Sequence, residues 1–306
     1  MPQPPRFDPQ RRLALRTALP MGVAALAGLG LAGCSLPRWP LGGALAAPER
    51  RENVVALTQS QKLVSFNAAQ PGRIRSSKPV KGLQIGEQLL GLDYRAKNDT
   101  LYALGSSGQL YTVDTDNGQL TPVGGPAAIP LDGTEFGMDF NPTVDRIRVV
   151  SNTRLNLRVH PDTGSLVGGQ PDTPLAYDAS DRHAGRAPRL VAAAYSYDPA
   201  NPKVTTNYAL DAATGCLVIQ GSLEGATPVI SPNTGRLFTV GELGLGTFDR
   251  AAFDIHTLAN TAFAAITLRG SATSTWVELD VKTGRATALG AIAVGEPVRA
   301  IALESW

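Results

Sequence analysis

The chain has 306 residues, of which 18% are charged and two are cysteines, and its formal net charge is +2. Two cysteines exclude both a disulfide scaffold and a four-cysteine zinc site. The 32 glycines and 23 prolines together stay below the roughly 25–30% that is typical of low-complexity chains. The composition therefore predicts a folded protein with a hydrophobic core.

The first 33 residues have the composition of an export signal. They hold four arginines against one aspartate, so the rest of the chain carries a net charge of −1. The apolar run MGVAALAGLGLAG at 21–33 is shorter than the roughly 20 residues of a membrane-spanning helix, and it fits the apolar part of a signal peptide. Because the remainder is nearly neutral and has no basic stripe, we expect no nucleic-acid partner.

The segment Leu31-Ala32-Gly33-Cys34 matches the lipobox of bacterial lipoprotein signals. We expect lipidation of the Cys34 thiol, which would hold the exported protein to a membrane leaflet through acyl chains. An ordinary secretory signal, cleaved before Ala47, is the alternative. Ser35 stands where an aspartate would retain a lipoprotein in the inner membrane, so it favours the outer membrane or the periplasmic face. Arg11-Arg12 leave Sec and twin-arginine export both open.

The composition divides the chain into three parts. Residues 1–33 form the predicted signal peptide, residues 34–61 a tether rich in proline, glycine and alanine, and residues 62–306 a single folded domain. In that domain, short alternating apolar runs are separated by glycine, proline, asparagine and aspartate, a pattern typical of β-strands.

A pattern of a small, an apolar, a polar or small, and an apolar residue recurs five times in the folded part. It occurs at 91–94, 137–140, 194–197, 252–255 and 300–303. Turns of the form Asp-x-x-Thr/Asn-Gly, as at 114–118 and 280–284, lie between these strands, and their glycine supplies the left-handed conformation that such turns need. Each unit is about four strands long, which is the length of a propeller blade.

The order of these units predicts a closed ring. Four units are complete within 89–293, the last recurring strand stands alone at 298–303, and the β-like segments 62–67 and 73–80 precede the first unit. We therefore expect an all-β fold, a β-propeller of five four-stranded blades whose last blade combines N- and C-terminal strands. Closure would remove the sheet edges that invite aggregation. A two-sheet sandwich is the alternative architecture.

Two long segments carry a family resemblance. Residues 137–164, which read GMDFNPTVDRIRVVSNTRLNLRVHPDTG, and residues 91–124 resemble the bacterial domain of unknown function 4394 family. Shorter segments at 193–195, 240–244 and 253–255 agree, so the similarity extends over about 62–303. The resemblance implies exported, repetitive, propeller-like proteins, and it brings no activity, substrate or catalytic residue. The lipobox departs from the common family pattern, so anchoring depends on this chain's own residues.

The innermost strands carry the most suggestive polar side chains. Period-two alternation puts one polar side chain of each strand on the same face as the preceding small residue, namely Asp93, Asp139, Ser196 and Asp254. These groups would either form a central funnel that holds a cation or a polar ligand, or bond the adjacent blade and fix its packing. The candidate ligand-binding residues of the funnel are Asp93, Asp139, Asn141, Arg146, Arg148, Asp254 and His256.

Arg146 and Arg148 alternate with apolar residues on the second strand of one blade. Their guanidinium groups are expected either to pair with Asp139 and Asp145 between blades or to bind an anionic ligand.

The loop at 177–183 brings two carboxylates and an imidazole close together in sequence, in Asp178, Asp181 and His183. These residue types form either a weak metal site or an ordinary polar loop. Cys216 lies in a predicted strand and is expected to be a small buried residue.

The folded part contains no HExxH, CxxC, GxSxG or P-loop motif, so no catalytic residue is predicted. The function that we predict is a binding or interaction module of the cell envelope, monomeric, attached to the membrane by its lipid, with an unknown protein or a small polar ligand as its partner. No cofactor is required, although a divalent cation fits the funnel. The alternatives are a metal-assisted hydrolase or lyase acting in the funnel and a purely structural envelope protein.

Overall fold

The computed structural model describes residues 50–125, 129–198, 201 and 204–304. The predicted signal peptide, Cys34 and most of the predicted tether lie outside the described residues. Within the described ranges, no helix is both long enough and apolar enough to cross a membrane.

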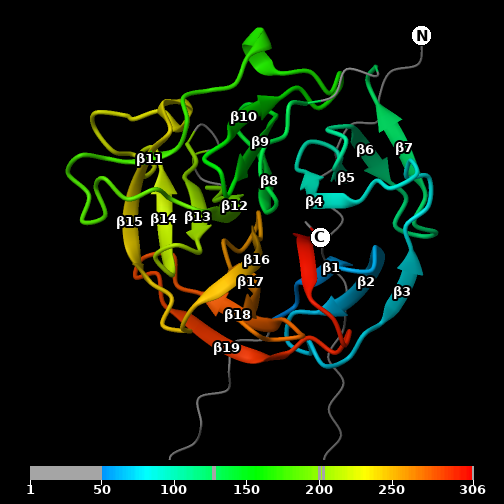
Figure 1. Ribbon diagram of the computed structural model, residues 1–306. Coiled ribbons are helices and arrows are strands. Elements are labelled where there is room, and N and C mark those ends of the chain that lie inside the picture. Colours follow the sequence, from blue (N-terminus) through cyan, green and yellow to red (C-terminus); the bar gives the residue numbers. More distant parts are fainter. Residues whose placement is uncertain (1–49, 126–128, 199–200, 202–203, 305–306) are drawn as a thin grey trace, which may run out of the picture. The chain divides into compact units, whose positions relative to one another are not determined.

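The described residues form five sheets arranged around one axis (Figure 1). Blade 1 consists of β4 (Leu89–Arg95), β5 (Thr100–Gly105), β6 (Leu110–Val113) and β7 (Leu120–Val123). Blade 2 consists of β8 (Phe136–Asn141), β9 (Arg146–Ser151) and β10 (Asn156–Val159). Blade 3 consists of β12 (Leu190–Tyr195), β13 (Asn207–Asp211), β14 (Cys216–Gln220), β15 (Arg236–Glu242) and β11 (Ala176–Tyr177).

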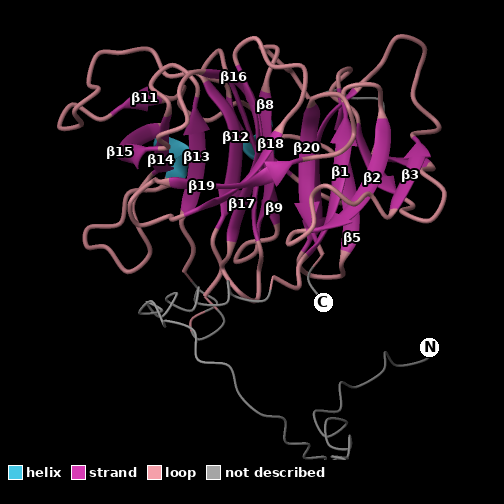
Figure 2. Ribbon diagram, turned by 90° about the horizontal axis from the view of Figure 1, so that it is seen from below, coloured by secondary structure: helices cyan, strands magenta, loops and turns pink. Residues whose placement is uncertain are grey.

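Blade 4 consists of β16 (Phe248–Ile255), β17 (Ala262–Leu268), β18 (Thr275–Leu279) and β19 (Ala286–Ala291). Blade 5 consists of β20 (Val298–Leu303), β1 (Asn53–Thr58), β2 (Lys62–Asn67) and β3 (Ser76–Pro79). The strands β4, β8, β12, β16 and β20 lie innermost, and loops gather at both ends of the strands (Figure 2). Two short 3-10 helices, η1 (Val167–Gly169) and η2 (Pro232–Thr234), lie in the loops of blades 2 and 3. The expected all-β, five-bladed propeller is confirmed.

Blade 5 closes the ring with both ends of the described chain. The C-terminal strand β20 pairs with β1, and β1 pairs with β2, in antiparallel register. The predicted joining of N- and C-terminal strands is thus confirmed. However, β1 lies inside the segment 34–61 that we predicted as a tether, so the folded domain begins before residue 62. This strand lacks the alternation of a half-exposed strand because both of its faces are covered, from Val54 through Thr58.

Blades 2 and 3 depart from the expected four strands. After β10 the chain makes only an isolated bridge, between Val159 and Leu166, and then passes to blade 3, where β11 pairs in parallel with β15. The segment that would complete blade 2 therefore extends blade 3 instead. The outer edge of β10 is therefore not covered by a fourth strand.

The core is divided into five apolar clusters, one at each contact between neighbouring blades. Between blades 4 and 5, the fully buried Trp276 stacks on Phe263 at 5.2 Å and meets the edge of Phe66 at 5.1 Å, while its indole N–H donates to the carbonyl of Ala68. Near the axis, small residues are required: a Cβ on Gly137 would lie 2.4 Å from the backbone nitrogen of Ala193. Cys216 is buried in blade 3, as expected.

The position of β1 predicts where the folded domain can be truncated. A chain beginning at Pro48 should fold, whereas one beginning at Lys62 should lose most of its stability, because it leaves β2 and β20 without the strand between them. Burying each Val or Leu side chain contributes about 1.5–3 kcal/mol, and β1 buries three of them. Thermal melts followed by circular dichroism will compare the two chains. Equal melting temperatures would show that β1 is dispensable.

Candidate functional site

Three buried carboxylates meet on the axis of the propeller. Asp93, Asp139 and Asp254 come from the innermost strands β4, β8 and β16, and each residue is at most 6% exposed. One oxygen atom of each carboxylate lies within 4.8 Å of those of the other two. The structure thus brings together three of the residues that the sequence placed in a central funnel.

These carboxylates bind the backbones of the innermost strands. Asp93 accepts hydrogen bonds from the amide N–H groups of Tyr94 and Phe140, at 2.7 and 2.6 Å. Asp254 accepts from Ile255 and Leu303, at 2.6 and 2.7 Å. Asp139 accepts from Tyr195 at 3.2 Å. Three of the five bonds run to the next blade, so the carboxylates connect neighbouring innermost strands that share no backbone ladder.

The same strand position holds alanine in the other two blades, Ala194 and Ala302. Because these alanines offer no acceptor to the following blade, Ile255 and Tyr94 bond instead to the aspartate of their own strand. The amide of Tyr195 bonds to Asp139 as the amide of Phe140 bonds to Asp93, so Tyr195 is the counterpart of Phe140. The recurring four-residue pattern of blade 3 therefore lies at 192–195. The predicted repeat at 194–197 was therefore wrong by two residues, since the chain leaves β12 after Tyr195, and Ser196 is not the counterpart of the aspartates.

Burial raises the pKa of all three carboxyl groups, and repulsion between them raises it further for Asp93 and Asp139. Burial raises the pKa of Asp254 to about 6. Burial, and secondarily the charge of Asp254, raises the pKa of Asp93 well above its ordinary value. Burial, followed by the charges of Asp93 and Asp254, does the same for the pKa of Asp139. Among the described residues no cation pairs with any of them, so the group holds protons where exposed aspartates are fully ionised.

One oxygen of the group remains open. Five of the six carboxylate oxygens accept a backbone hydrogen bond, and the second oxygen of Asp139 accepts none from the described residues. The narrow cavity beside the three carboxylates has a volume of about 20 Å³, which is room for about one water molecule. The axis is therefore almost filled at this level.

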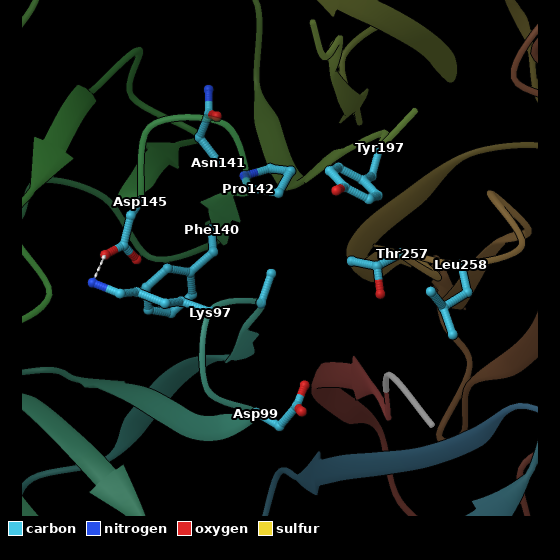
Figure 3. A pocket seen from close by; sticks show the side chains of 10 residues that line it. Lys97, Asp99, Phe140, Asn141, Pro142, Asp145, Tyr197, Thr257 and Leu258 are labelled. Carbon is cyan, nitrogen blue, oxygen red and sulfur yellow. Dashed lines mark ion pairs between the residues drawn. The ribbon is translucent and has the colours of Figure 1, made fainter. Parts of the chain in front are cut away.

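A larger cavity of about 460 Å³ opens above the carboxylates, and we call it the axial cavity. It shares Ala96, Phe140, Pro142 and Thr257 with the narrow cavity, so the two adjoin. Its remaining lining residues come from the end of β8 and from loops that follow β4, β8, β12 and β16, namely Lys97, Asp99, Asn141, Asp145, Tyr197 and Leu258 (Figure 3). In Figure 3, Lys97 and Asp145 form an ion pair on one side, at 3.8 Å, and Asp99 lies apart from them.

Two other predicted funnel residues lie beyond the carboxylates along the same strands. Asn141 lines the axial cavity, and its side-chain oxygen accepts bonds from the amides of Thr143 and Val144 in its own turn. His256 is buried, with Nε2 bonded to the carbonyl of Glu304 and Nδ1 accepting from the amide of Ala259. Both ring nitrogens are thus engaged by the backbone rather than by the carboxylates.

The predicted partners of Arg146 and Arg148 were wrong. Arg148 pairs with Asp172 at 2.8 Å, and Arg146 donates to the backbone carbonyls of Val144 and Asp145. The carboxylate of Asp145 is instead paired with Arg95 of blade 1. Arg148 reaches Tyr195 and Asn233 on the side of blade 3, and Asp172, in the segment after β10, is the carboxylate beside it.

The structure does not gather the side chains of Asp178, Asp181 and His183 into a metal site. Asp178 pairs with Arg236, whereas Asp181 accepts bonds from the backbone N–H and the hydroxyl of Thr239. His183 also contacts the Thr239 hydroxyl, at 3.0 Å. Each side chain is thus used to hold the loop against β15. Within the described ranges, Asp93, Asp139 and Asp254 are the only acidic, histidine or cysteine side chains that converge closely enough to share an ion.

Most residues of the axial cavity lie outside the recurring patterns of the sequence. Lys97, Asp99, Tyr197 and Thr257 were not proposed, because they lie in loops with no recurring pattern. What these residues share is their position in the chain, because each follows the end of an innermost strand by two to four residues. Loops after equivalent strands of a propeller meet at the same end of the axis.

A family model covers nearly all of this structure. It is described as Domain of unknown function (DUF4394) and matches residues 62–302. The chain belongs to this family. Among curated proteins, none matches the chain. The family match begins at β2, so it leaves out β1, the strand that completes blade 5 in this family member.

Several solved structures are similar to the chain at low sequence identity. A putative 6-phosphogluconolactonase from Bacteroides uniformis is 15% identical, with a TM-score of 0.39 and coverage of 84% of this chain and 72% of that one. TolB from Acinetobacter baumannii is 10% identical, with a TM-score of 0.43 and coverage of 78% and 53%. A chain of a nidogen/laminin complex is 11% identical, with a TM-score of 0.41 and coverage of 83% and 98%.

The bonding of the three aspartates predicts different effects for the same substitution. Asp139→Asn keeps the single acceptor that Tyr195 uses and removes a charge, so it should stabilise the protein by about 1 kcal/mol near pH 7.5. Asp93→Asn and Asp254→Asn each replace an acceptor oxygen by an NH2 group, and the orphaned amide should cost about 1–3 kcal/mol. Urea unfolding of the three variants will measure these differences, and an Asp139→Asn variant as unstable as Asp254→Asn would contradict the assignment.

The same groups predict how stability depends on pH. Because the pKa of Asp254 is raised to about 6 in the folded state, the folded protein keeps a proton that the unfolded chain releases. The resulting stabilisation is complete below the ordinary aspartate pKa of about 3.9 and is lost as the pH rises through about 6. Urea unfolding of the unmodified protein should therefore show a lower free energy at pH 7.5 than at pH 5. The difference should shrink in Asp139→Asn, which removes one of the three carboxyl groups with a raised pKa.

Proposed function

We propose that the protein is a binding module of the bacterial cell envelope that holds a small, positively charged polar ligand in the axial cavity. The observation that carries this proposal is the cavity of about 460 Å³ opening over three buried carboxylates that have no cationic partner among the described residues. Cavities of roughly 300–1,000 Å³ are typical of small-molecule sites.

The charge of the ligand follows from the groups that line its site. The carboxylates beneath the cavity gain stability when a positive charge approaches, because it compensates both their burial and their repulsion. Low-dielectric walls strengthen that attraction. Asp99 adds a further carboxylate at the rim, whereas Lys97 is already beside Asp145. A protonated amine or a metal cation has the complementary charge.

The bonding of the carboxylates supports binding rather than catalysis. A divalent metal that activates water needs several free protein oxygens, and five of the six oxygens here already accept backbone hydrogen bonds. Among the residues that the structure describes, none donates a hydrogen bond to the second oxygen of Asp139. This arrangement suits a single cationic group resting on the axis better than a fully coordinated catalytic metal.

The proposed location in the envelope rests on the leader sequence. An arginine-rich start, a short apolar run and the Leu31-Ala32-Gly33-Cys34 lipobox together indicate export and lipidation. A lipid on Cys34 would tether the propeller to the membrane surface through the segment that precedes β1. The propeller would then sample its ligand outside the cytoplasm.

The ligand proposal predicts stabilisation by cations. Calcium chloride or 1,4-diaminobutane should raise the melting temperature of the protein, and more so at pH 8 than at pH 5.5, because binding must displace protons from the carboxyl groups. Asp139→Asn and Asp99→Asn should each weaken the effect about tenfold in apparent affinity, which corresponds to about 1.4 kcal/mol.

Asp116→Asn is the matched control for this experiment. It removes the same charge from an exposed turn between β6 and β7, remote from the lining of the axial cavity, and it should respond to cations as the unmodified protein does. If neither cation shifts the melting temperature, or if all three variants respond alike, the axial cavity is not a cation site.

The lipid anchor has its own test. Cells expressing the protein and fed an alkyne-bearing palmitate should label it at Cys34, and the protein should sediment with membranes. Cys34→Ala should abolish the label and release the protein into the soluble fraction. Cys216→Ala provides the control, because Cys216 is buried in blade 3 and the variant should be labelled normally. Labelling that survives in Cys34→Ala would rule out this anchor.

A further inference from the structure

A second cavity lies between blades 2 and 3, and its charge is opposite to that of the axial cavity. Its volume is about 400 Å³, and we call it the interblade cavity. It opens beside β10, where blade 2 lacks a fourth strand, and it is lined by residues of β9 and β10, by η1 and by the turn at 231–233. Three of the lining side chains are arginines, Arg146, Arg148 and Arg158.

Asp172 is the only carboxylate that pairs with these arginines within the described ranges. Its carboxylate oxygens form ion pairs with guanidinium nitrogens of Arg148 and Arg158, each at 2.8 Å, and its side chain is 8% exposed. Arg146 forms no ion pair there and donates only to backbone carbonyls. Three positive charges thus face one negative charge, which leaves an excess of two positive charges around the cavity.

The arginines differ in how firmly they are held. Arg148 is buried, and it donates to Tyr195, Asn156, Asp172 and Asn233, so it supports the walls of the cavity. Arg158 binds Asp172 through Nε and one Nη2 hydrogen, which leaves its Nη1 group without a partner among the described residues. Nε and Nη2 of Arg146 likewise have no partner in the described part of the chain.

The other polar groups of the cavity are also unused donors. Tyr195 is 4% exposed, and its hydroxyl oxygen accepts from Arg148 while its hydrogen has no acceptor among the described residues. The side-chain oxygens of Asn233 and Asn141 are occupied as acceptors, which leaves their NH2 groups for a ligand. A cavity in which the spare groups donate, and which has excess positive charge, complements an anion with several oxygens.

From these observations we propose that the interblade cavity is a binding site for a small oxyanion, a ligand bearing carboxylate or phosphate groups. Arg158 and Arg146 bind its charged oxygens, and the Tyr195 hydroxyl donates to a third. Arg148 and Asp172 hold these donor groups in position and do not themselves bind the ligand. The buried hydroxyl hydrogen of Tyr195 then gains the acceptor that it lacks, which adds to the affinity.

The test uses citrate and inorganic phosphate as probes at constant ionic strength, with binding measured by calorimetry. The unmodified protein should bind at least one of them at millimolar concentration or below, and the preferred probe shows whether planar carboxylates or a tetrahedral phosphate fit. The double variant Arg146→Gln, Arg158→Gln should bind about a hundredfold more weakly, about tenfold for each charge-assisted contact. Asp172 remains paired with Arg148 in this variant, so no carboxylate is stranded.

Two comparisons make the result specific. Arg269→Gln removes the same charge from an exposed ion pair with Asp249 in blade 4, and it should bind the probes as the unmodified protein does. Asp99→Asn, which alters the lining of the axial cavity alone, should also keep full anion binding, and this separates the proposal from the cation site on the axis. The proposal fails if neither probe binds the unmodified protein, or if the double variant, with an unchanged melting temperature and circular dichroism spectrum, binds as tightly as Arg269→Gln.

Discussion

The bonds between buried carboxylates and the amides of neighbouring innermost strands are the interaction on which the centre of this propeller depends. Innermost strands of adjacent blades stand side by side around the axis without a backbone ladder, so their N–H groups need acceptors from elsewhere. Three aspartates provide acceptors for five such amides. Asp93 and Asp254 each serve two amides, one through each carboxylate oxygen, and Asp139 serves one. The cost of this arrangement is the concentration of three acidic groups in a space of low dielectric.

The same arrangement links structure to the proposed function. Carboxyl groups that are indispensable as acceptors cannot be replaced by apolar residues without orphaning amides, so a negative site persists on the axis. Around it, the loops that follow the innermost strands form a cavity of suitable size for a small ligand. Further out, the missing fourth strand of blade 2 leaves an opening that arginines line. The two cavities share only Asn141 among their lining residues, and they carry opposite charge.

Closure of the ring sets the limits of the folded domain. The apolar clusters lie between blades, so each blade is stable only when both of its neighbours are present. Blade 5 depends on β1 in particular, because this strand stands between β20 and β2. Its position explains why a segment that follows a proline- and alanine-rich stretch is nevertheless part of the core.

The sequence by itself determined the class of fold, the number of blades, the closing of the ring and the presence of acidic residues near the axis. These properties follow from local patterns, because alternation, turn residues and small innermost residues recur in every blade. Tertiary structure alone decided the start of the domain at β1, the register of β12, the partners of Arg148 and the loops that form the axial cavity. A strand covered on both faces shows no alternation, an arginine pairs with whichever carboxylate the fold places beside it, and loops far apart in sequence meet only when the ring closes.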